Sequence, residues 1–214
     1  PSLCRVAMCV GKCSRIVGPC LLALGTLSVA ANILLLFPGG ASKYLVEGHI
    51  SKDATTMPGV WGGGITVSIA VSTPPFLACP WSREQGMEQG APLRLPPSAF
   101  PFPQLALLGA AACFVLSGVG LTNGPLCFYN ASEHGTLWGY PFLDAGSQEP
   151  DARVENYLYD RRRWSTCLEP AGIVAWNVVL FSLLLLVSAA EMVLASLQIL
   201  NGCFGCLCGF CEGK

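Results

Sequence analysis

Long apolar runs without any charged side chain recur along this chain of 214 residues. Four windows lack Asp, Glu, Lys and Arg altogether: residues 16–42, 54–82, 95–132 and 170–190. Each window can hold a helix of about 20 residues, the length that crosses about 30 Å of hydrocarbon. The pattern therefore predicts an all-α membrane protein, a bundle of four transmembrane helices.

We expect the four spans at residues 16–37, 60–80, 104–122 and 171–200. The first has a cleaved signal peptide as its alternative, because Ser28-Val29-Ala30 resembles a cleavage site. Its apolar run continues to Leu36, which is longer than a signal core. The second span is the weakest, since it contains Gly62-Gly63-Gly64 and the helix-breaking pair Pro74-Pro75. A re-entrant stretch is the alternative there.

The segments between the spans give the rest of the organisation. We expect a cytosolic N-terminus, a small extracellular loop, a cytosolic loop, a large extracellular loop and a cytosolic Cys-rich tail at residues 1–15, 38–59, 81–103, 123–170 and 201–214. The large loop contains eight aromatic residues. Disordered segments are poor in aromatic residues, so this loop is expected to fold into a small lobe.

Composition narrows the function classes. Hydrophobic residues make up 52% of the chain and charged residues only 12%, about half the charged fraction of soluble domains. The net charge is -1, so nothing indicates a nucleic-acid partner.

Lysine and arginine residues divide evenly, six against six, between the two sides of the membrane. The first span usually has most influence on orientation, and Lys12 and Arg15 before it favour a cytosolic N-terminus. Asn130-Ala131-Ser132, the only N-x-[ST] sequon, lies in the large loop. It would be a glycosylation site if that loop is luminal.

The cysteines fall into different chemical settings. Cys127 and Cys167 flank the large loop, and they can meet if the third and fourth spans are neighbours. An oxidising lumen favours a bridge between them, worth about 4 kcal/mol for a loop of this size. Two free thiols are the alternative.

Cysteines next to the membrane predict lipidation. Cytosolic cysteines beside a span are sites of reversible palmitoylation, and here they are Cys9, Cys13, Cys203, Cys206, Cys208 and Cys211. Zinc is the alternative for the last four, which form two C-x-x-C pairs. One residue separates the pairs, which leaves no finger to fold around a metal, so we expect no cofactor. Three further cysteines, Cys20, Cys79 and Cys113, are expected in apolar packing.

No catalytic motif is present in the sequence. The two histidines, His49 and His134, lie in predicted loops and are interpreted as surface residues. Asn32 in the first span and Glu191 in the fourth are intramembrane polar residues, which are functional candidates by default. Hydrogen bonding to a neighbouring helix is the favoured interpretation of Glu191, and ion transport is the alternative.

An ordered set of segments resembles the transmembrane four L-six family. They are MCVGKCSRIVG, ANILLLFPGG, VWGGGI, SGVGLTNGPLC, WGYPF, NYLYDRRRW, CLEP, WNVVLFSLLL and LQILNGCFGCLCGFC. Together they cover most of the chain in the family's order. The proline-rich segment 81–103 departs from the family, which has a cysteine-rich loop there.

The resemblance implies a tetraspanin-like tetraspan protein with both ends in the cytosol and a glycosylated, disulfide-linked extracellular lobe. It implies residence in the plasma membrane or an endolysosomal membrane. It also implies a scaffold whose partners are integrins, receptors, tetraspanins or further copies of itself. Membrane lipids are also expected partners. Such scaffolds influence adhesion, migration, proliferation and differentiation. The alternative function is a regulatory subunit or lateral modulator of a transporter or channel.

Overall fold

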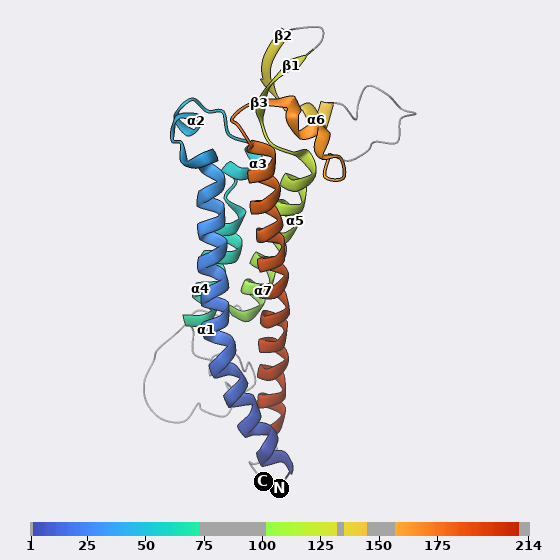
Figure 1. Cartoon of the computed structure of the whole chain (residues 1–214). Helices are drawn as coiled ribbons and strands as arrows, with labels where there is room; N and C mark the ends of the chain where they lie inside the picture. The colour runs from blue at the N-terminus through green and yellow to red at the C-terminus, as the bar shows by residue number, and fades with distance from the viewer. Residues whose placement is uncertain (1, 73–101, 132–134, 145–156, 210–214) are drawn as a thin grey trace.

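The computed structural model describes residues 2–72, 102–131, 135–144 and 157–209. Three long helices dominate it: α1 (Ser2–Leu36), α5 (Phe102–Asn123) and α7 (Ile173–Gly209). Figure 1 shows them running together, with a lobe at one end. The N-terminal end of α1 and the C-terminal end of α7 lie at the other end.

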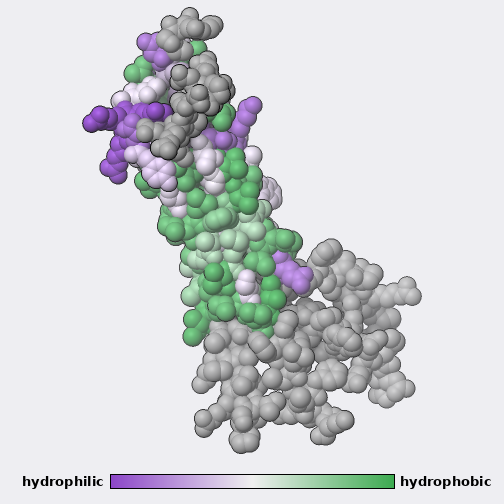
Figure 2. Space-filling view, turned by 90° about the vertical axis from the view of Figure 1, so that its right-hand side faces the viewer, coloured by the Kyte–Doolittle hydropathy of each residue, from purple (hydrophilic) through white to green (hydrophobic). Residues whose placement is uncertain are grey.

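Three helices in the described part of the chain are long and apolar enough to cross a membrane. These segments are Ile16–Leu36, Gln104–Asn123 and Ile173–Leu200, with mean hydropathies of 2.0, 2.1 and 2.5. On the face shown in Figure 2, hydrophobic residues cover most of the helical part, and most of the hydrophilic residues are gathered at the lobe end. This confirms the predicted mostly helical membrane fold.

The second span begins as a π-helix, η2 (Gly59–Ile65), and continues as α4 (Thr66–Ser72). The rest of this span and the loop after it, residues 73–101, lie outside the described residues. π-Helical turns are rare and often mark functional positions. Here the turn coincides with the three consecutive glycines of the sequence.

The glycines of η2 let the second span approach its neighbours closely. A Cβ on Gly62 would lie 2.5 Å from the carbonyl oxygen of Gly109 on α5. A Cβ on Gly59 would lie 2.6 Å from the carbonyl oxygen of Ser28 on α1. Both distances are shorter than any real Cβ contact, so only glycine fits this packing.

The lobe contains a three-stranded antiparallel sheet with strand order β2-β1-β3. The strands are β1 (Cys127–Ala131), β2 (Gly135–Gly139) and β3 (Cys167–Glu169). A short helix, α6 (Pro141–Asp144), and a 3-10 helix, η5 (Arg161–Thr166), complete it. The sheet was not expected from the hydropathy pattern; aromatic residues such as Phe128 and Trp138 favour strands.

Helical structure also extends beyond the expected segment bounds. α1 begins at Ser2 and α7 continues to Gly209, so the segments next to the membrane prolong the spans. The small loop holds η1 (Pro38–Gly40), α2 (Lys43–Val46) and α3 (Lys52–Thr55). A helix needs no new signal to continue past the hydrocarbon, because its backbone hydrogen bonds are local.

Candidate functional site

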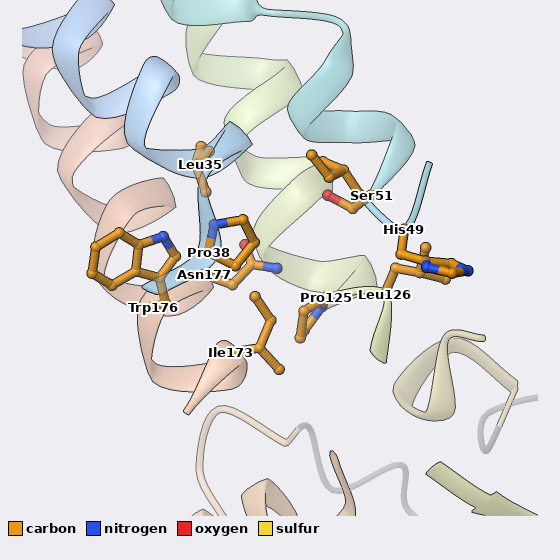
Figure 3. A pocket seen from close by; sticks show the side chains of 10 residues that line it. Leu35, Pro38, His49, Ser51, Pro125, Leu126, Ile173, Trp176 and Asn177 are labelled. Atoms are coloured by element: carbon orange, nitrogen blue, oxygen red, sulfur yellow. The ribbon is translucent and has the colours of Figure 1, made fainter. Parts of the chain in front are cut away.

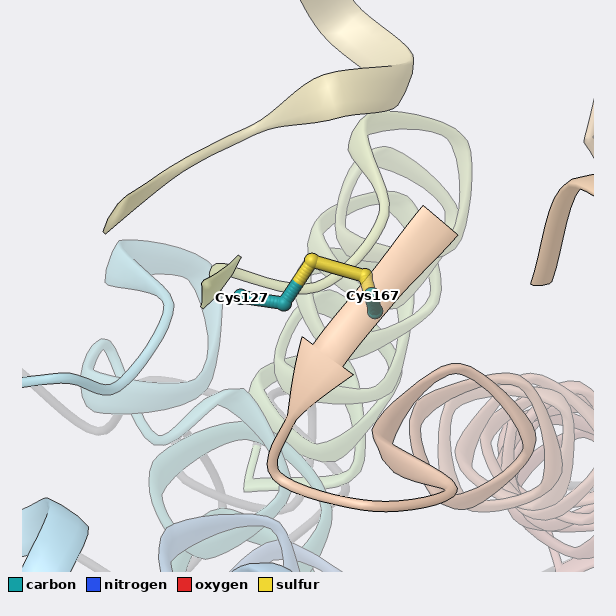
Figure 4. The surroundings of a disulfide bond; sticks show 2 residues. All are labelled: Cys127 and Cys167. Carbon is teal, nitrogen blue, oxygen red and sulfur yellow. A yellow bond between two sulfur atoms is a disulfide. The ribbon is translucent and has the colours of Figure 1, made fainter. Parts of the chain in front are cut away.

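A disulfide joins the two ends of the lobe. Cys127 at the start of β1 and Cys167 at the start of β3 are bonded, with their Cα atoms 5.6 Å apart (Figure 4). Cys127 is fully buried. The bond fastens the end of α5 to the start of α7 through the sheet, which confirms the predicted disulfide-linked lobe.

Aromatic side chains fill the lobe beneath the disulfide. The Tyr157 ring stacks on Phe142 with centroids 4.3 Å apart, and its hydroxyl donates to the carbonyl oxygen of Leu121 at the end of α5. Trp164 Nε1 donates to the Tyr157 carbonyl oxygen at 2.9 Å. The lobe is therefore seated on α5 by a buried tyrosine.

Burial of Tyr157 has a consequence at alkaline pH. Desolvation raises the pKa of its hydroxyl from the ordinary 10.0 to about 12. The stability contributed by the neutral phenol is present below pH 10 and is lost as the pH rises through about 12. We expect ultraviolet titration to detect one late-ionising tyrosine that Tyr157→Phe removes. Its persistence in that variant would contradict the assignment.

The small loop docks against the lobe. The His49 ring stacks on Trp138 of β2, with centroids 4.0 Å apart and planes 4° from parallel. The backbone N–H of Lys52 donates to the Tyr140 hydroxyl at 3.1 Å. His49 is therefore a partly buried packing residue rather than a free surface residue. His134 lies outside the described residues.

Four exposed side chains, apolar and cationic, occur within ten residues of the lobe sequence. Tyr159 is 90% exposed and Leu168 is 54% exposed. Arg161 and Arg162 lie exposed between them in the chain. We call these four residues the outer patch.

Two contacts restrain the η5 part of the outer patch. The Asp160 carboxylate accepts from the backbone N–H of Arg162 at 3.0 Å and so caps η5. The Arg161 guanidinium lies over the Trp164 ring, 5.5 Å from its centroid. A surface that is ordered before binding loses less conformational entropy when a partner docks.

Asn32 links the first two spans. It is fully buried, and its Oδ1 accepts from the Gly59 N–H at 2.7 Å, at the start of the second span. Its Nδ2 donates to the Ala54 carbonyl oxygen at 3.4 Å. This side chain therefore caps a helix whose first N–H groups have no partner within the helix.

Replacing Asn32 with alanine is expected to destabilise the bundle by about 1–3 kcal/mol, because a buried donor is left unpaired. The measurement is a melt of the purified protein in detergent micelles. Thr26→Ala is the control, since the Thr26 hydroxyl is exposed and bonds only within α1. Equal melting of the two variants would contradict the capping role.

Glu191 lies deeper in the bundle. It is fully buried on α7, and neither carboxylate oxygen has a hydrogen-bond partner among the described residues. The hydroxyl of Ser28 on α1 is equally buried and, within the same residues, unpartnered. Asn32 and Glu191 thus lie in different surroundings: the amide is paired and the acid is not.

A small cavity opens where the helices meet the lobe. Its volume is ≈ 20 Å³, and apolar side chains make up most of its wall, with His49, Ser51 and Asn177 as polar members (Figure 3). Such a volume holds about one water molecule. The cavity is too small for an organic substrate.

The structure describes the backbone of five of the six predicted lipidation sites but none of their side chains. Cys9, Cys13, Cys203, Cys206 and Cys208 lie on the ends of α1 and α7, but their side chains are outside the described set, as is all of Cys211. Cys79 is also outside it. Of the other apolar cysteines, Cys113 is buried and Cys20 is exposed on the surface of α1. No group of three metal-binding side chains occurs among the residues described.

Comparison with known proteins gives matches over almost the whole chain. The family model described as L6 membrane protein matches residues 8–212. Transmembrane 4 L6 family member 19 of Mus musculus is 39% identical over 219 residues, covering 99% of this chain and 98% of that protein. Transmembrane 4 L6 family member 1 of Homo sapiens is 35% identical, covering 95% and 96%. No solved structure matches the chain.

Proposed function

We propose that this chain, which belongs to the L6 membrane protein family, is a scaffold that clusters receptors or adhesion proteins in the bilayer. The chain is a multi-pass membrane protein and not an enzyme. In this proposal it resides in the plasma membrane or an endolysosomal membrane. It influences adhesion, migration, proliferation or differentiation by bringing its partners together.

The observation that carries the proposal is the outer patch. A tyrosine that is 90% exposed, followed closely in the chain by two exposed arginines, is a residue combination enriched at the centres of protein interfaces. The patch lies on a lobe that is fastened to the bundle by a disulfide and by Tyr157. A partner bound there is held beside the membrane, where its own transmembrane segment is anchored.

The test is crosslinking of the full-length protein in intact cells, with partners quantified by mass spectrometry. Tyr159→Ala and Arg162→Ala are each expected to weaken partner capture, by about 30-fold if the side chain contributes about 2 kcal/mol. Lys43→Ala is the control, because Lys43 is an exposed cation in the small loop. Unchanged capture in both patch variants, at equal surface level, would remove the outer patch from the proposal.

The regulatory-subunit function remains the second candidate, and the lipid-facing side chains favour it. Leu186 on α7 is 71% exposed and Leu108 on α5 is 67% exposed, so both faces are open to a neighbouring helix. The crosslinking separates the two functions. A stoichiometric transporter or channel captured through these helices, and not through the lobe, would favour the modulator.

Glycosylation of the lobe is part of the proposal. Asn130 is exposed in β1, opposite Thr136 of β2, so an oligosaccharyltransferase can reach it. We expect glycosidase digestion to shift the wild-type band and not that of Asn130→Gln. Thiol labelling from each side should find Cys206 cytosolic. An unshifted wild-type band together with an outward-facing Cys206 would reverse the orientation.

A further inference from the structure

Glu191 is the one ionisable Asp, Glu, Lys, Arg or His in the described span segments, residues 16–36, 59–72, 104–123 and 173–200. It is fully buried, and both of its oxygens are unpartnered among the described residues. A bare carboxylate in hydrocarbon surroundings is strongly unfavourable. These segments supply no basic side chain, so within them nothing offsets a charge on Glu191, and a bound cation would do so.

Ser28 marks where that cation is held. Its hydroxyl is fully buried on α1 and unpartnered within the described residues. A Cβ built on Gly63 would collide with the Ser28 hydroxyl and would lie 3.0 Å from Glu191 Oε2. The two unpartnered groups therefore lie close to the same glycine of the second span.

The other described groups around Glu191 and Ser28 carry no positive charge. On α5, the Cys113 thiol is the titratable group that faces Ser28, Gly63 and Glu191, and its sulfur is 3.9 Å from the Ser117 hydroxyl. On α7, the Ser188 hydroxyl is engaged with the Leu184 carbonyl oxygen at 2.7 Å. Within the described span segments, residues 16–36, 59–72, 104–123 and 173–200, no Lys, Arg or His opposes Glu191.

We propose that Glu191 and Ser28 form a binding site for one small monovalent cation, H⁺ or Na⁺, enclosed between α1, α7 and the glycine turn of the second span. The carboxylate supplies the charge and two oxygens, and the hydroxyl supplies a third. The bound cation joins α7 to α1 and therefore stabilises the closed bundle. This site is independent of the outer patch and of the proposed scaffold function.

The experiment uses the full chain in lipid nanodiscs. Melting is followed in NaCl against choline chloride at equal ionic strength, and across a series of pH values. If the cation is Na⁺, the melting temperature is higher in NaCl. If it is H⁺, the melting temperature falls as the pH rises, and the infrared spectrum at neutral pH contains the C=O stretch of a protonated carboxylic acid.

Three variants test whether Glu191 and Ser28 are responsible for the dependence of the melting temperature on Na⁺ or pH. Glu191→Gln is expected to abolish the dependence, and Ser28→Ala to weaken the apparent affinity about tenfold, as loss of one hydrogen bond to a charged group does. Glu169→Gln, which changes an exposed carboxylate of β3, should leave the dependence intact. If Glu191→Gln does not fold, the infrared band and the Ser28→Ala shift still decide the question.

Two results would overturn the proposal. One is a wild-type protein that responds to neither Na⁺ nor pH and shows no acid band. The other is a folded Glu191→Gln variant with the wild-type cation dependence.

Discussion

Substitution of Gly62 by alanine is expected to destabilise the bundle by about 3 kcal/mol or more, the upper range for forcing extra atoms into a packed core. The added Cβ would lie 2.5 Å from the Gly109 carbonyl oxygen and 3.0 Å from Cys113 Cβ. The first obstacle is backbone, which cannot rotate away as a side chain can. The second span would have to separate from α5.

Gly118 on α5 provides a matched control. A Cβ there meets only the Leu185 side chain, at an ordinary 3.9 Å. Alanine is favoured over glycine in a helix by about 0.5–1 kcal/mol, so Gly118→Ala should be neutral or slightly stabilising. Thermal melts of both variants in the same detergent measure the difference. Similar melting temperatures would show that the second span does not pack on α5 as described.

Removal of the disulfide is expected to cost about 4 kcal/mol of lobe stability. The bond closes a loop with a sequence separation of 40, and the chain-entropy relation gives this value for such a loop. The Cys127→Ala and Cys167→Ala double variant avoids a stray thiol. Without the bond, the lobe is held by Tyr157, by the sheet and by its contacts with the small loop, so we expect local unfolding well below the melting of the helices.

Tryptophan fluorescence in a denaturant series reports on this unfolding, because Trp138 and Trp164 lie in the lobe. Cys20→Ala is the control: it removes a thiol that is exposed on α1. The double variant should show an early transition that the control lacks. If the double variant and the control unfold at the same denaturant concentration, the disulfide does not contribute to the stability of the lobe.

The sequence alone predicts the spans because the requirement that lipid places on a membrane-crossing segment can be checked along the sequence, one segment at a time. A segment that crosses hydrocarbon must satisfy its own backbone, so it must be a long apolar helix. Residues 16–36 and 173–200 obey this rule visibly. The second span obeys it less clearly, because its packing selects glycines, whose hydropathy is weak.

The lobe follows no such rule, and its sheet was not predicted. Strand β1 pairs with β2 nearby in the chain but also with β3, about 40 residues away. Non-local pairing of that kind leaves no period in a single sequence. The stacking of His49 on Trp138 could not be predicted from the sequence either, because it depends on where two loops meet in space.

The candidate sites show the same division. Glu191 is conspicuous in the sequence because an acid interrupts an apolar run. Its companions Ser28 and Gly63 are not, because small residues are common in membrane helices for reasons of packing. Tyr159 and Arg162 are ordinary loop residues until their exposure is known. The type of a residue indicates from the sequence alone what chemistry it can perform. Which residues lie next to it is known only from the folded structure.

Because the small loop rests on the lobe through His49, Trp138 and Tyr140, the surface at this end of the molecule is built from two stretches that are far apart in the sequence. An antibody raised against the intact protein would read a discontinuous epitope. A synthetic peptide copied from either loop would present half of it. Antibodies for this protein should therefore be selected on the folded protein, and a negative immunoblot of a reduced sample would not show that the protein is absent.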